Sequence, residues 1–399
     1  MPHYDVLIIG AGPAGSAAAL ACVRRGLRVA LVERSRFPRD KVCGDALIPD
    51  SLQALRELDL LERVLEVAHR VNAVRIYAPN GRYTALEGEC ACVPRLVFDD
   101  LLRSAATEAG AEFFSPLRAV APLDENGVVV GARFVRAEGP PIDLRAAITI
   151  LATGAAADVL ARFGVCLRTA PSATAARLYV QVDQRTARDH DHLCVAYTAA
   201  ICPGYGWVFP GPDGVFNVGV GYVYGPQAPR ERNIRKLLNQ FLTSFPPAAG
   251  LMKAARGLTP LKGAPLRTAM KGSRLSRPGV IVVGEAAGLT YSFSGEGIGK
   301  AMQSGILAAD VAAASAAAAN PPRVAADTYE ARLPAAFADR VRAYERLQRF
   351  VTAPLLANAL IWRANSGSYV HRQLQALLTE TGRADELLSL PGIARALLT

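Results

Sequence analysis

The chain has 399 residues, 51% of them hydrophobic, which is enough to bury a sizeable core and to form two or three closely joined domains. Its formal net charge of +10 comes largely from arginines that are scattered along the chain, so nucleic-acid binding is not expected. Seven cysteines without a C-x-x-C pair fit neither a disulfide framework nor a zinc site, and they indicate a cytoplasmic protein. No stretch offers about 18 uninterrupted apolar residues, so no transmembrane helix is expected.

The N-terminal segment YDVLIIGAGPAGSAAALACVRRGLRVALVER has the pattern of a βαβ unit. The expected elements are a strand over 6–9, an Ala-rich helix over about 13–25 and a strand over 28–32. In the turn, Gly10 permits the sharp bend, Gly12 lets the backbone approach a pyrophosphate, and Gly15 lets the helix pack closely on the strand. The phosphates then lie at the helix N-terminus, where free N–H groups and the dipole favour anions.

Glu33 ends the second predicted strand, where its carboxylate can accept hydrogen bonds from ribose hydroxyls. The glycine motif follows a strand, opens a helix and has this acid about twenty residues later, so the sequence predicts a dinucleotide site. The residues expected to contact the dinucleotide here are Gly10, Gly12, Pro13, Ala14, Gly15, Glu33 and Arg34.

The loop FPRDKVCGDALIP, residues 37–49, follows this unit and places Cys43 between Lys41 and Gly44. Taken alone, a free cysteine is most often a small buried apolar residue. The loop by itself therefore leaves open whether Cys43 is a packed side chain or a group placed beside a cofactor.

Residues from about 172 to 224 alternate and are rich in β-forming side chains, so they predict a sheet. Two of its strands, GYGWVFP and VFNVGVGYV, are joined by the turn GPDG. The tetrapeptide DHDH, residues 189–192, lies between two predicted strands without partner histidines nearby. We interpret it as a solvent-exposed loop and assign no metal.

The segment RPGVIVVGEAAGLTYSFSGEGIGKAMQSGILAADVA, residues 277–312, repeats the pattern of the N-terminus. It predicts an apolar strand over 280–283, a Gly284–Glu285 step, a second glycine turn and a long helix from about Ile298. Each of the two glycine turns suits a phosphate group, which indicates one extended ligand that contacts both turns.

This segment resembles the second FAD motif of glutathione reductase-type flavoproteins, in particular those with the para-hydroxybenzoate hydroxylase fold. The resemblance implies FAD as the cofactor, with Glu285 in place of the family's aspartate at the ribitol or pyrophosphate. The helix from Ile298 would point its N-terminus at the isoalloxazine ring. The segment VPRLVFDDLLRSAATEAGAEF likewise resembles the family helix that carries an arginine, here Arg95, beside the flavin.

The segment ITILATGAAADV resembles the turn that hydroxylases write as Ala-Asp-Gly followed by Ser, but Thr153 replaces the acid and Ala157 the serine. This departure removes groups that assist nicotinamide docking in hydroxylases. No second G-x-G-x-x-G follows a strand, so a separate Rossmann domain for NAD(P)H is not expected. We expect electrons from transiently docked NAD(P)H, or from a separate flavin reductase or ferredoxin as an electron-donor partner.

Three further motifs resemble those of geranylgeranyl reductases. GYGWVFPGPDGVFNVGVG matches their Y-x-W-x-F-P…G-x-G motif, SFSGEGI matches their T-G-E-G-I turn, and the loop matches their Pro-x-x-Lys-x-Cys-Gly segment through Pro38, Lys41, Cys43 and Gly44. The resemblance covers about residues 1–310, with five motifs in order. It implies an apolar slot in which aromatic side chains accept a prenyl chain.

The resemblance also implies the site residues. The implied catalytic residues are Cys43, Tyr205 and Trp207. Further implied cofactor contacts are Lys41, Cys43, Gly44, Arg95, Thr153, Gly154, Gly284, Glu285, Gly295, Gly297 and Ile298. The implied substrate contacts are Phe209, Pro210, Gly219, Gly221 and Ser294.

The expected fold is α/β, with a discontinuous Rossmann-like FAD-binding domain, an inserted, mainly antiparallel β-sheet substrate domain and a helical C-terminal region. The FAD domain is expected over 1–70, 95–170 and 273–322, the substrate domain over 71–94 and 171–272, and the helical region over 323–399. The segment 336–362 is amphipathic, which leaves open a packed helix or peripheral contact with a membrane.

The expected function is an FAD-dependent oxidoreductase that reduces, or dehydrogenates, a carbon–carbon bond by hydride transfer at flavin N5. The expected substrate is a small hydrophobic isoprenoid, polyene or secondary metabolite, either free or bound to a carrier protein. The alternative is a flavin-dependent tailoring monooxygenase or halogenase, although the halogenase loop Gly-Glu-Ser and W-x-W-x-I-P motif are not intact. A flavin-based electron-transfer protein is a more distant alternative, because the cysteines end at Cys202 and provide no C-terminal iron–sulfur set.

Overall fold

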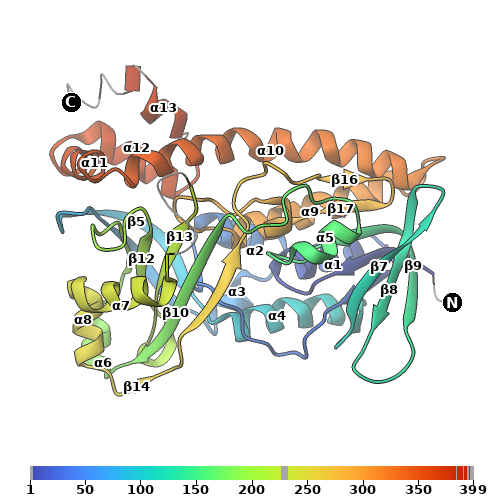
Figure 1. The fold of residues 1–399 in the computed structure, drawn as a ribbon, viewed down its shortest axis with the longest axis horizontal. Coiled ribbons are helices and arrows are strands. Elements are labelled where there is room, and N and C mark those ends of the chain that lie inside the picture. The colour runs from blue at the N-terminus through green and yellow to red at the C-terminus, as the bar shows by residue number, and fades with distance from the viewer. Residues whose placement is uncertain (1–2, 226–231, 383, 390, 393–394, 396–399) are drawn as a thin grey trace.

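The computed structural model describes residues 3–225, 232–382, 384–389, 391–392 and 395. Within these residues the chain forms one sheet of eight strands and one of nine, with helices packed against both (Figure 1). This arrangement confirms the predicted α/β fold class. The two sheets lie side by side along the length of the molecule, and a long helix crosses above them.

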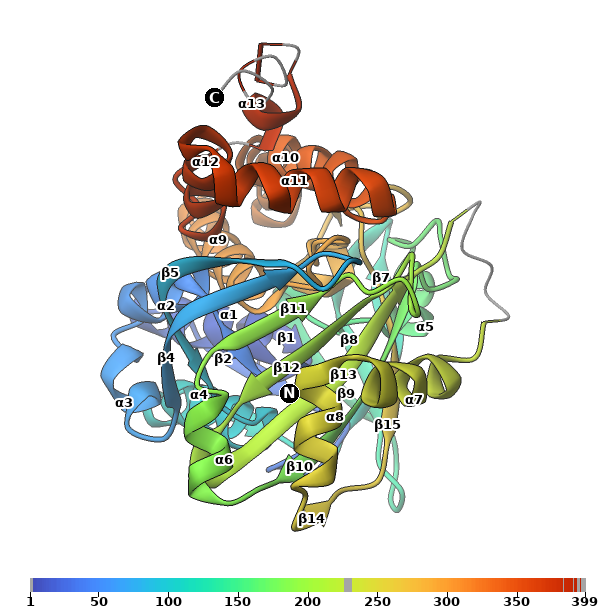
Figure 2. The same ribbon diagram turned by 90° about the vertical axis from the view of Figure 1, so that its left-hand side faces the viewer.

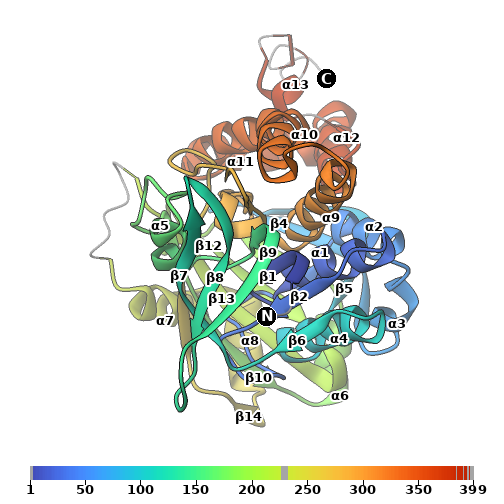
Figure 3. The ribbon, with the colours of Figure 1, turned by 90° about the vertical axis from the view of Figure 1, so that its right-hand side faces the viewer.

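The eight-stranded sheet has a parallel core in the order β6–β2–β1–β9–β17. All four residues of β2 are buried, as expected for a parallel sheet that is covered on both faces. Of the three remaining strands, β16 pairs antiparallel with β17, and β7 and β8 form a hairpin that extends from β9 (Figure 3). The strands of this sheet are β1 (His3–Ile9), β2 (Val29–Val32), β6 (Glu112–Phe114), β7 (Arg118–Glu125), β8 (Val128–Val135), β9 (Ile142–Leu151), β16 (Ser276–Arg277) and β17 (Val280–Val282).

Two helices that follow glycine turns, α1 (Pro13–Arg24) and α9 (Ile298–Ser315), pack directly against each other. Small side chains allow this close approach: a Cβ atom on Gly305 would lie 2.3 Å from the carbonyl oxygen of Ala14. The two segments that each resemble an FAD motif are therefore neighbours in space. Further helices are α2 (Pro49–Glu57), α3 (Leu61–Leu65), α4 (Arg95–Glu108) and α5 (Ala157–Arg162), with the 3-10 turn η2 (Gly284–Ala287).

The nine-stranded sheet is antiparallel except where β4 and β11 pair in parallel. Helices α6 to α8 lie around its outer side (Figure 2), and a Cβ on Gly206 would lie 2.3 Å from the Phe241 ring of α7. The strands are β3 (Ala46–Leu47), β4 (His69–Tyr77), β5 (Tyr83–Cys92), β10 (Ala173–Gln181), β11 (Leu193–Ala196), β12 (Tyr205–Pro210), β13 (Val215–Val223), β14 (Gly257–Leu258) and β15 (Lys262–Leu266). The helical elements are α6 (Gln184–Asp189), η1 (Pro212–Gly214), α7 (Ile234–Ser244) and α8 (Pro246–Lys253).

The C-terminal region is helical. Helix α10 packs along α9, while α11 and α12 lie over β5 of the nine-stranded sheet (Figures 1 and 2). The Gln375 side chain accepts a hydrogen bond from the Glu87 N–H at 2.9 Å, which fixes α12 to β5. Among the described helices, none is both long and apolar enough to cross a membrane. The helices of this region are α10 (Pro321–Val351), α11 (Pro354–Ser366), α12 (Ser368–Leu378) and α13 (Ala384–Leu388).

The first βαβ unit and the helix from Ile298 lie where the sequence predicts them. The short strand β3 differs from the expected domain division, because it pairs with β5 of the nine-stranded sheet although it lies within segment 1–70. The loop that contains Cys43 therefore passes from one sheet to the other. Its two-residue strand carries no periodicity from which this pairing could be predicted.

The DHDH tetrapeptide is exposed at Asp189 and Asp191, as expected, but its first residue is helical and its last is buried. Asp189 is the last residue of helix α6. His192 is buried, and this burial, together with the positive charge of Arg75, lowers the pKa of its imidazole to about 4. Asp191 lies 2.6 Å from His69 on β4, a partner that sequence distance conceals. Within the described residues no group of His, Cys, Asp and Glu side chains is arranged to hold a metal ion.

Candidate active site

Two cavities of about 230 and 170 Å³ lie between the sheets and the α1–α9 pair. They share a boundary of five residues, Pro13, Lys41, Arg95, Glu285 and Ala301. We call them the cofactor cavity, bounded by the first glycine turn, and the substrate cavity, bounded by β12. Because they share these residues, the cavities form one elongated site for an extended ligand.

Gly12 lies at the floor of the cofactor cavity, at the N-terminus of α1, where no side chain caps the helix. A Cβ atom on Gly12 would point into open space, with the closest atoms being the guanidinium Nη2 of Arg39 at 3.6 Å and of Arg95 at 3.9 Å. Free helix N–H groups and two guanidinium groups thus surround one space, which suits the pyrophosphate of FAD. The residues present fit this cofactor.

The other two glycines of the motif shape the turn. Gly10 has a φ of +108°, and a Cβ there would lie 2.4 Å from the carbonyl oxygen of Ala152 on β9's side of the turn. A Cβ on Gly15 would lie 1.8 Å from the carbonyl oxygen of Gly10. Gly15 therefore does not line the cavity but allows α1 to begin directly behind it.

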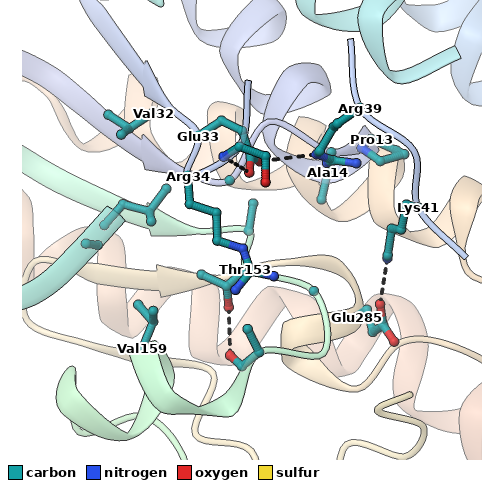
Figure 4. A pocket seen from close by; sticks show the side chains of 18 of the residues that line it. Pro13, Ala14, Val32, Glu33, Arg34, Arg39, Lys41, Thr153, Val159 and Glu285 are labelled. Atoms are coloured by element: carbon teal, nitrogen blue, oxygen red, sulfur yellow. Dashed lines mark hydrogen bonds and ion pairs between the residues drawn. The ribbon is translucent and has the colours of Figure 1, made fainter. Parts of the chain in front are cut away.

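Four charged side chains, connected by hydrogen bonds and ion pairs, lie beside Gly12. Arg39 lies 3.6 Å from Glu33 and donates a 2.9 Å hydrogen bond to Asp99, which also accepts two bonds from Arg95, at 2.6 and 2.8 Å. Burial alone would lower the pKa of Arg95, but Asp99 and Cys43 raise it above its ordinary value. Two carboxylates thus hold both guanidinium groups in place at the floor of the cavity. Figure 4 shows the Glu33 and Arg39 side chains of this group.

The Glu33 carboxylate also accepts two backbone hydrogen bonds. Its Oε2 accepts a hydrogen bond from the Ala11 N–H at 3.1 Å, and its Oε1 accepts one from the Ser35 N–H at 3.0 Å. These bonds hold the carboxylate at the end of β2, the position where the sequence predicts ribose binding. Arg34 and Thr153 also line the cofactor cavity, while the Thr153 hydroxyl donates to the Ala156 carbonyl at 3.2 Å.

Glu285 crosses the boundary between the two cavities. Its Oε2 accepts a 3.0 Å hydrogen bond from the Lys41 ammonium, and its Oε1 accepts one from the Arg267 N–H at 3.2 Å (Figure 4). The side chain, one methylene longer than the family's aspartate, therefore ties the Cys43 loop to the second glycine turn. Gly154 lies beside this pair, since a Cβ there would be 3.4 Å from Glu285.

Three aromatic side chains of β12 form one wall of the substrate cavity. Tyr205, Trp207 and Phe209 alternate along the strand and so point to the same face, with successive ring centroids 6.0 and 6.4 Å apart. Gly221 and Gly219 lie behind these rings on β13: Cβ atoms there would be 2.7 Å from the Tyr205 ring and 2.2 Å from the Trp207 ring.

A buried hydrogen-bond network supports this wall. The indole N–H of Trp207 donates to Asn217 at 2.9 Å, and the Asn217 amide donates to the Cys43 carbonyl and to Asp45, both at 2.7 Å. The Tyr179 hydroxyl donates a 2.6 Å bond to the same oxygen of Asp45. The network joins the aromatic strand to the Cys43 loop, so the two motifs form one unit.

Asp45 is nearly inaccessible, has a φ of +69° and leaves its Oδ1 without a hydrogen-bond partner. Burial raises the pKa of this carboxyl to about 6, although the bonds from Tyr179 and Asn217 lower it. Because no group donates to Oδ1, the charged form is stabilised by hydrogen bonds to Oδ2 alone.

The far end of the substrate cavity is formed by the turn before α9, with Ser294, Gly295, Glu296 and Gly297. Gly295 has a φ of +71°, and a Cβ there would lie 1.8 Å from the Tyr205 hydroxyl oxygen. No side chain caps α9 at Gly297, so its first N–H groups face the cavity as those of α1 do.

The structure brings most of the predicted residues to the two cavities. Those that line the cavities are Gly10, Gly12, Pro13, Ala14, Glu33, Arg34, Lys41, Cys43, Gly44, Arg95, Thr153, Gly154, Tyr205, Trp207, Phe209, Glu285, Ser294, Gly295, Gly297 and Ile298. Those that lie behind the lining are Gly15, Pro210, Gly219, Gly221 and Gly284. The residues behind the lining position the walls and leave room for rings or helices, rather than contact a ligand.

Sequence reasoning missed Arg39, Asp99, Asp45 and Asn217. Two of them carried a local signal, because Asp45 directly follows the Cys43–Gly44 pair and Asn217 lies two residues before Gly219 in the same motif. Arg39 and Asp99 carried none, since the 60 residues between them hide their pairing.

Comparisons with known proteins agree with this geometry. Residues 3–338 match the family described as FAD binding domain. The digeranylgeranylglycerophospholipid reductase of Methanoculleus marisnigri is 32% identical over 364 residues, which cover 88% of this chain and 87% of that protein.

Solved structures share the fold. A geranylgeranyl bacteriochlorophyll reductase-like protein from Thermoplasma acidophilum has a TM-score of 0.78 at 24% identity, covering 100% of this chain and 96% of that one. A flavin-dependent brominase has a TM-score of 0.73 at 20% identity, covering 100% of this chain and 98% of that one.

The two-cavity site, the family match across most of the chain and the relative of nearly equal length lead to one assignment. The chain belongs to the family of FAD-binding-domain flavoproteins, and within it to the geranylgeranyl reductase-like FAD-dependent oxidoreductases.

Proposed function

We propose that the protein reduces a carbon–carbon double bond of an isoprenoid or polyene chain that lies against the β12 aromatic wall. The observation that carries this proposal is the shared boundary of the two cavities, which puts an apolar slot directly beside the FAD cradle. FAD, when bound and reduced, supplies the hydride from its N5. The residues of this chain bind and orient the alkene.

The chemistry of the aromatic wall suits an apolar chain. Tyr205, Trp207 and Phe209 offer a large apolar area, and the indole N–H of Trp207 is already satisfied by Asn217. A prenyl chain can therefore enter without leaving that group unpaired. The name of the Methanoculleus relative, a reductase of a digeranylgeranyl lipid, supports the same substrate class.

For the electron donor we propose NAD(P)H that docks transiently, or a separate flavin reductase or ferredoxin. Thr153 lies at the position where hydroxylases carry an acid that assists nicotinamide docking. Its hydroxyl already donates a hydrogen bond to the Ala156 carbonyl. This departure supports a partner protein as a donor alongside the nicotinamide. A substrate held by a carrier protein is compatible with the same cavity.

The test is turnover without oxygen. The FAD-loaded protein, reduced with dithionite under nitrogen, is mixed with geranylgeraniol, and products are identified by mass spectrometry. The proposal predicts products heavier by two hydrogens per reduced double bond. A strict requirement for oxygen would instead identify the monooxygenase or halogenase alternative, with which the brominase shares its fold.

A further inference from the structure

A group of buried charges lies behind the far end of the substrate cavity. Lys300 of α9 is completely buried, and its ammonium donates a 2.9 Å hydrogen bond to Asp50 of α2 and a second bond to Glu380, just after α12. Arg340 of α10 also pairs with Glu380. Two cations and two carboxylates therefore neutralise one another in this group, which we call the Lys300 cluster.

Glu296 is a third carboxyl beside the Lys300 cluster, and it lines the substrate cavity. Among the described residues it forms no ion pair, because both cations of the cluster are already used by Asp50 and Glu380. Lys300 and a hydrogen bond from Ser294 favour a carboxylate there, but they do not offset the cost of burying the charge near two other carboxylates. Burial, followed by the charges of Asp50 and Glu380, accordingly raises the pKa of Glu296 to about 8.

The surroundings of Glu296 come from several elements. The charged groups are Asp50 of α2, Lys300 of α9, Arg340 of α10 and Glu380 after α12. The other titratable groups that interact with it are Cys90, Tyr197, Tyr205, Tyr291 and Tyr344, each with its pKa raised mainly by burial and further by Glu296. None of these groups supplies a cation beyond the two that Glu380 and Asp50 neutralise.

We propose that Glu296 is the acid that protonates the substrate carbon, and that Glu380 of the C-terminal region, itself paired with Arg340, keeps it protonated by engaging Lys300. This inference rests on the proposed reduction. The proton of the Glu296 carboxyl bonds to one alkene carbon, while FAD, when bound and reduced, would supply the hydride for the other. The π bond breaks, two C–H bonds form, and the two electrons would come from the reduced FAD. Glu296 is left as a carboxylate, which water then reprotonates.

The assignment gives the C-terminal region a role in the reaction. Arg340 and Glu380 both lie outside residues 3–338, which match the FAD-binding family. Leu378 of α12 also lines the substrate cavity and packs on Gly88, where a Cβ would lie 3.1 Å from its Cδ2. Arg340 and Glu380 are positioning residues, because they act on the substrate only through Lys300 and Glu296.

The first test measures protonation without turnover. Infrared spectra of the FAD-loaded protein are recorded with and without ¹³C-labelled glutamate, from pH 6 to pH 10. We expect a protonated-carboxyl C=O band that disappears with a midpoint near pH 8 and is absent in Glu296→Gln. In Glu380→Gln the midpoint should fall by at least about one unit, because Lys300 becomes free to stabilise the Glu296 carboxylate. A band that Glu296→Gln leaves unchanged would overturn the inference.

The second test follows oxidation of the reduced FAD by geranylgeraniol under nitrogen. We expect the wild-type rate to fall as the pH rises through about 8, and Glu296→Gln to be about 100-fold slower and independent of pH. Glu296→Asp should keep the pH-dependent fall. The control Asp327→Asn, at an exposed position of α10, should match the wild type. If Glu296→Gln reacts like the wild type, only this inference fails. If the wild type does not react, the proposed reduction fails and this inference with it.

Discussion

The two cavities share five residues but differ in how completely their acids are paired with cations. At the cofactor cavity the lining acids Glu33 and Glu285, and Asp99 behind the lining, each face a guanidinium or ammonium group. In the substrate cavity, Asp45 leaves one oxygen unpartnered and Glu296 has no cation within ion-pair distance among the described residues. Fixed, paired charges suit a permanently charged pyrophosphate, whereas an acid held neutral, as Glu296 is below about pH 8, suits an apolar chain and can release a proton.

This difference in ion pairing shows how two adjoining cavities can bind ligands of different polarity, a charged cofactor and an apolar substrate. The cofactor side is built for rigid recognition, because its ion pairs hold Arg39 and Arg95 at fixed distances from Gly12. The substrate side adds the aromatic side chains of β12 and two acids, Asp45 and Glu296, for which no ion pair is found among the described residues. Substitutions that alter charge on the cofactor side should therefore affect folding and FAD binding, while those on the substrate side should affect turnover and its pH dependence.

The largest effect is expected on the cofactor side from Asp99→Asn. Arg95 is almost completely buried and cannot lose its proton, so the substitution leaves an uncompensated buried cation. The free energy of unfolding should fall by about 3–5 kcal/mol, as measured by urea titration followed by fluorescence. The matched control is Glu108→Gln, which removes an exposed ion pair with Arg63 and should leave the titration unchanged. If both variants had the same free energy of unfolding, the pairing of Asp99 with buried Arg95 would not stabilise the cofactor side.

Gly12→Ala should separate FAD binding from folding. The added Cβ has room in the protein, since its nearest neighbours are 3.6 and 3.9 Å away, but it occupies the space that suits a pyrophosphate. We expect FAD affinity to fall about 100-fold, roughly 2.7 kcal/mol, while the melting temperature of the FAD-free protein is unchanged. Titration calorimetry measures the affinity, and Gly250→Ala on α8, where a Cβ has open space, is the control. Retained affinity would show that the pyrophosphate lies elsewhere.

Cys43→Ala should act on the substrate side. Its thiol lies in the substrate cavity beside Arg95, and its carbonyl holds Asn217. We expect FAD to remain bound, because the cofactor charges are intact, and turnover to fall about tenfold or more. Flavin absorbance and anaerobic turnover measure the two properties. Unchanged turnover would mean that Cys43 only packs the loop.

Asp45→Asn should produce the smallest effect, in the pH dependence of stability. The pKa of Asp45 is raised to about 6, so between about pH 4 and pH 6 the folded protein holds a proton that the unfolded chain releases. The wild type should therefore lose stability relative to Asp45→Asn as the pH rises through this window, by about 2–4 °C in melting temperature. Above about pH 6 the difference should stay constant. Asparagine tolerates the left-handed backbone here and keeps an oxygen for Tyr179 and Asn217. A difference in melting temperature that stays the same at every pH would show that folding does not raise the pKa of Asp45.

Much of the fold and of the cofactor side could be predicted from the sequence. The glycine turn at 10–15, the acid at Glu33 and the helix from Ile298 each depend on local backbone geometry, which a short motif records directly. The aromatic side chains of β12 could be placed on one face because a strand alternates with a period of two. The role of Gly219 and Gly221 could not, since a glycine motif does not say whether a ligand or a ring fills the space.

By itself the sequence determined the FAD-binding topology, the order of the motifs and the aromatic character of the substrate slot. Only the tertiary structure decided which charges meet. Lys300 is 250 residues from Asp50 and 80 from Glu380, and Asn217 is 172 from Asp45. Local patterns specify strands and turns because neighbouring residues form them. The protonation state of an acid such as Glu296 depends instead on cations and carboxylates that distant elements bring together.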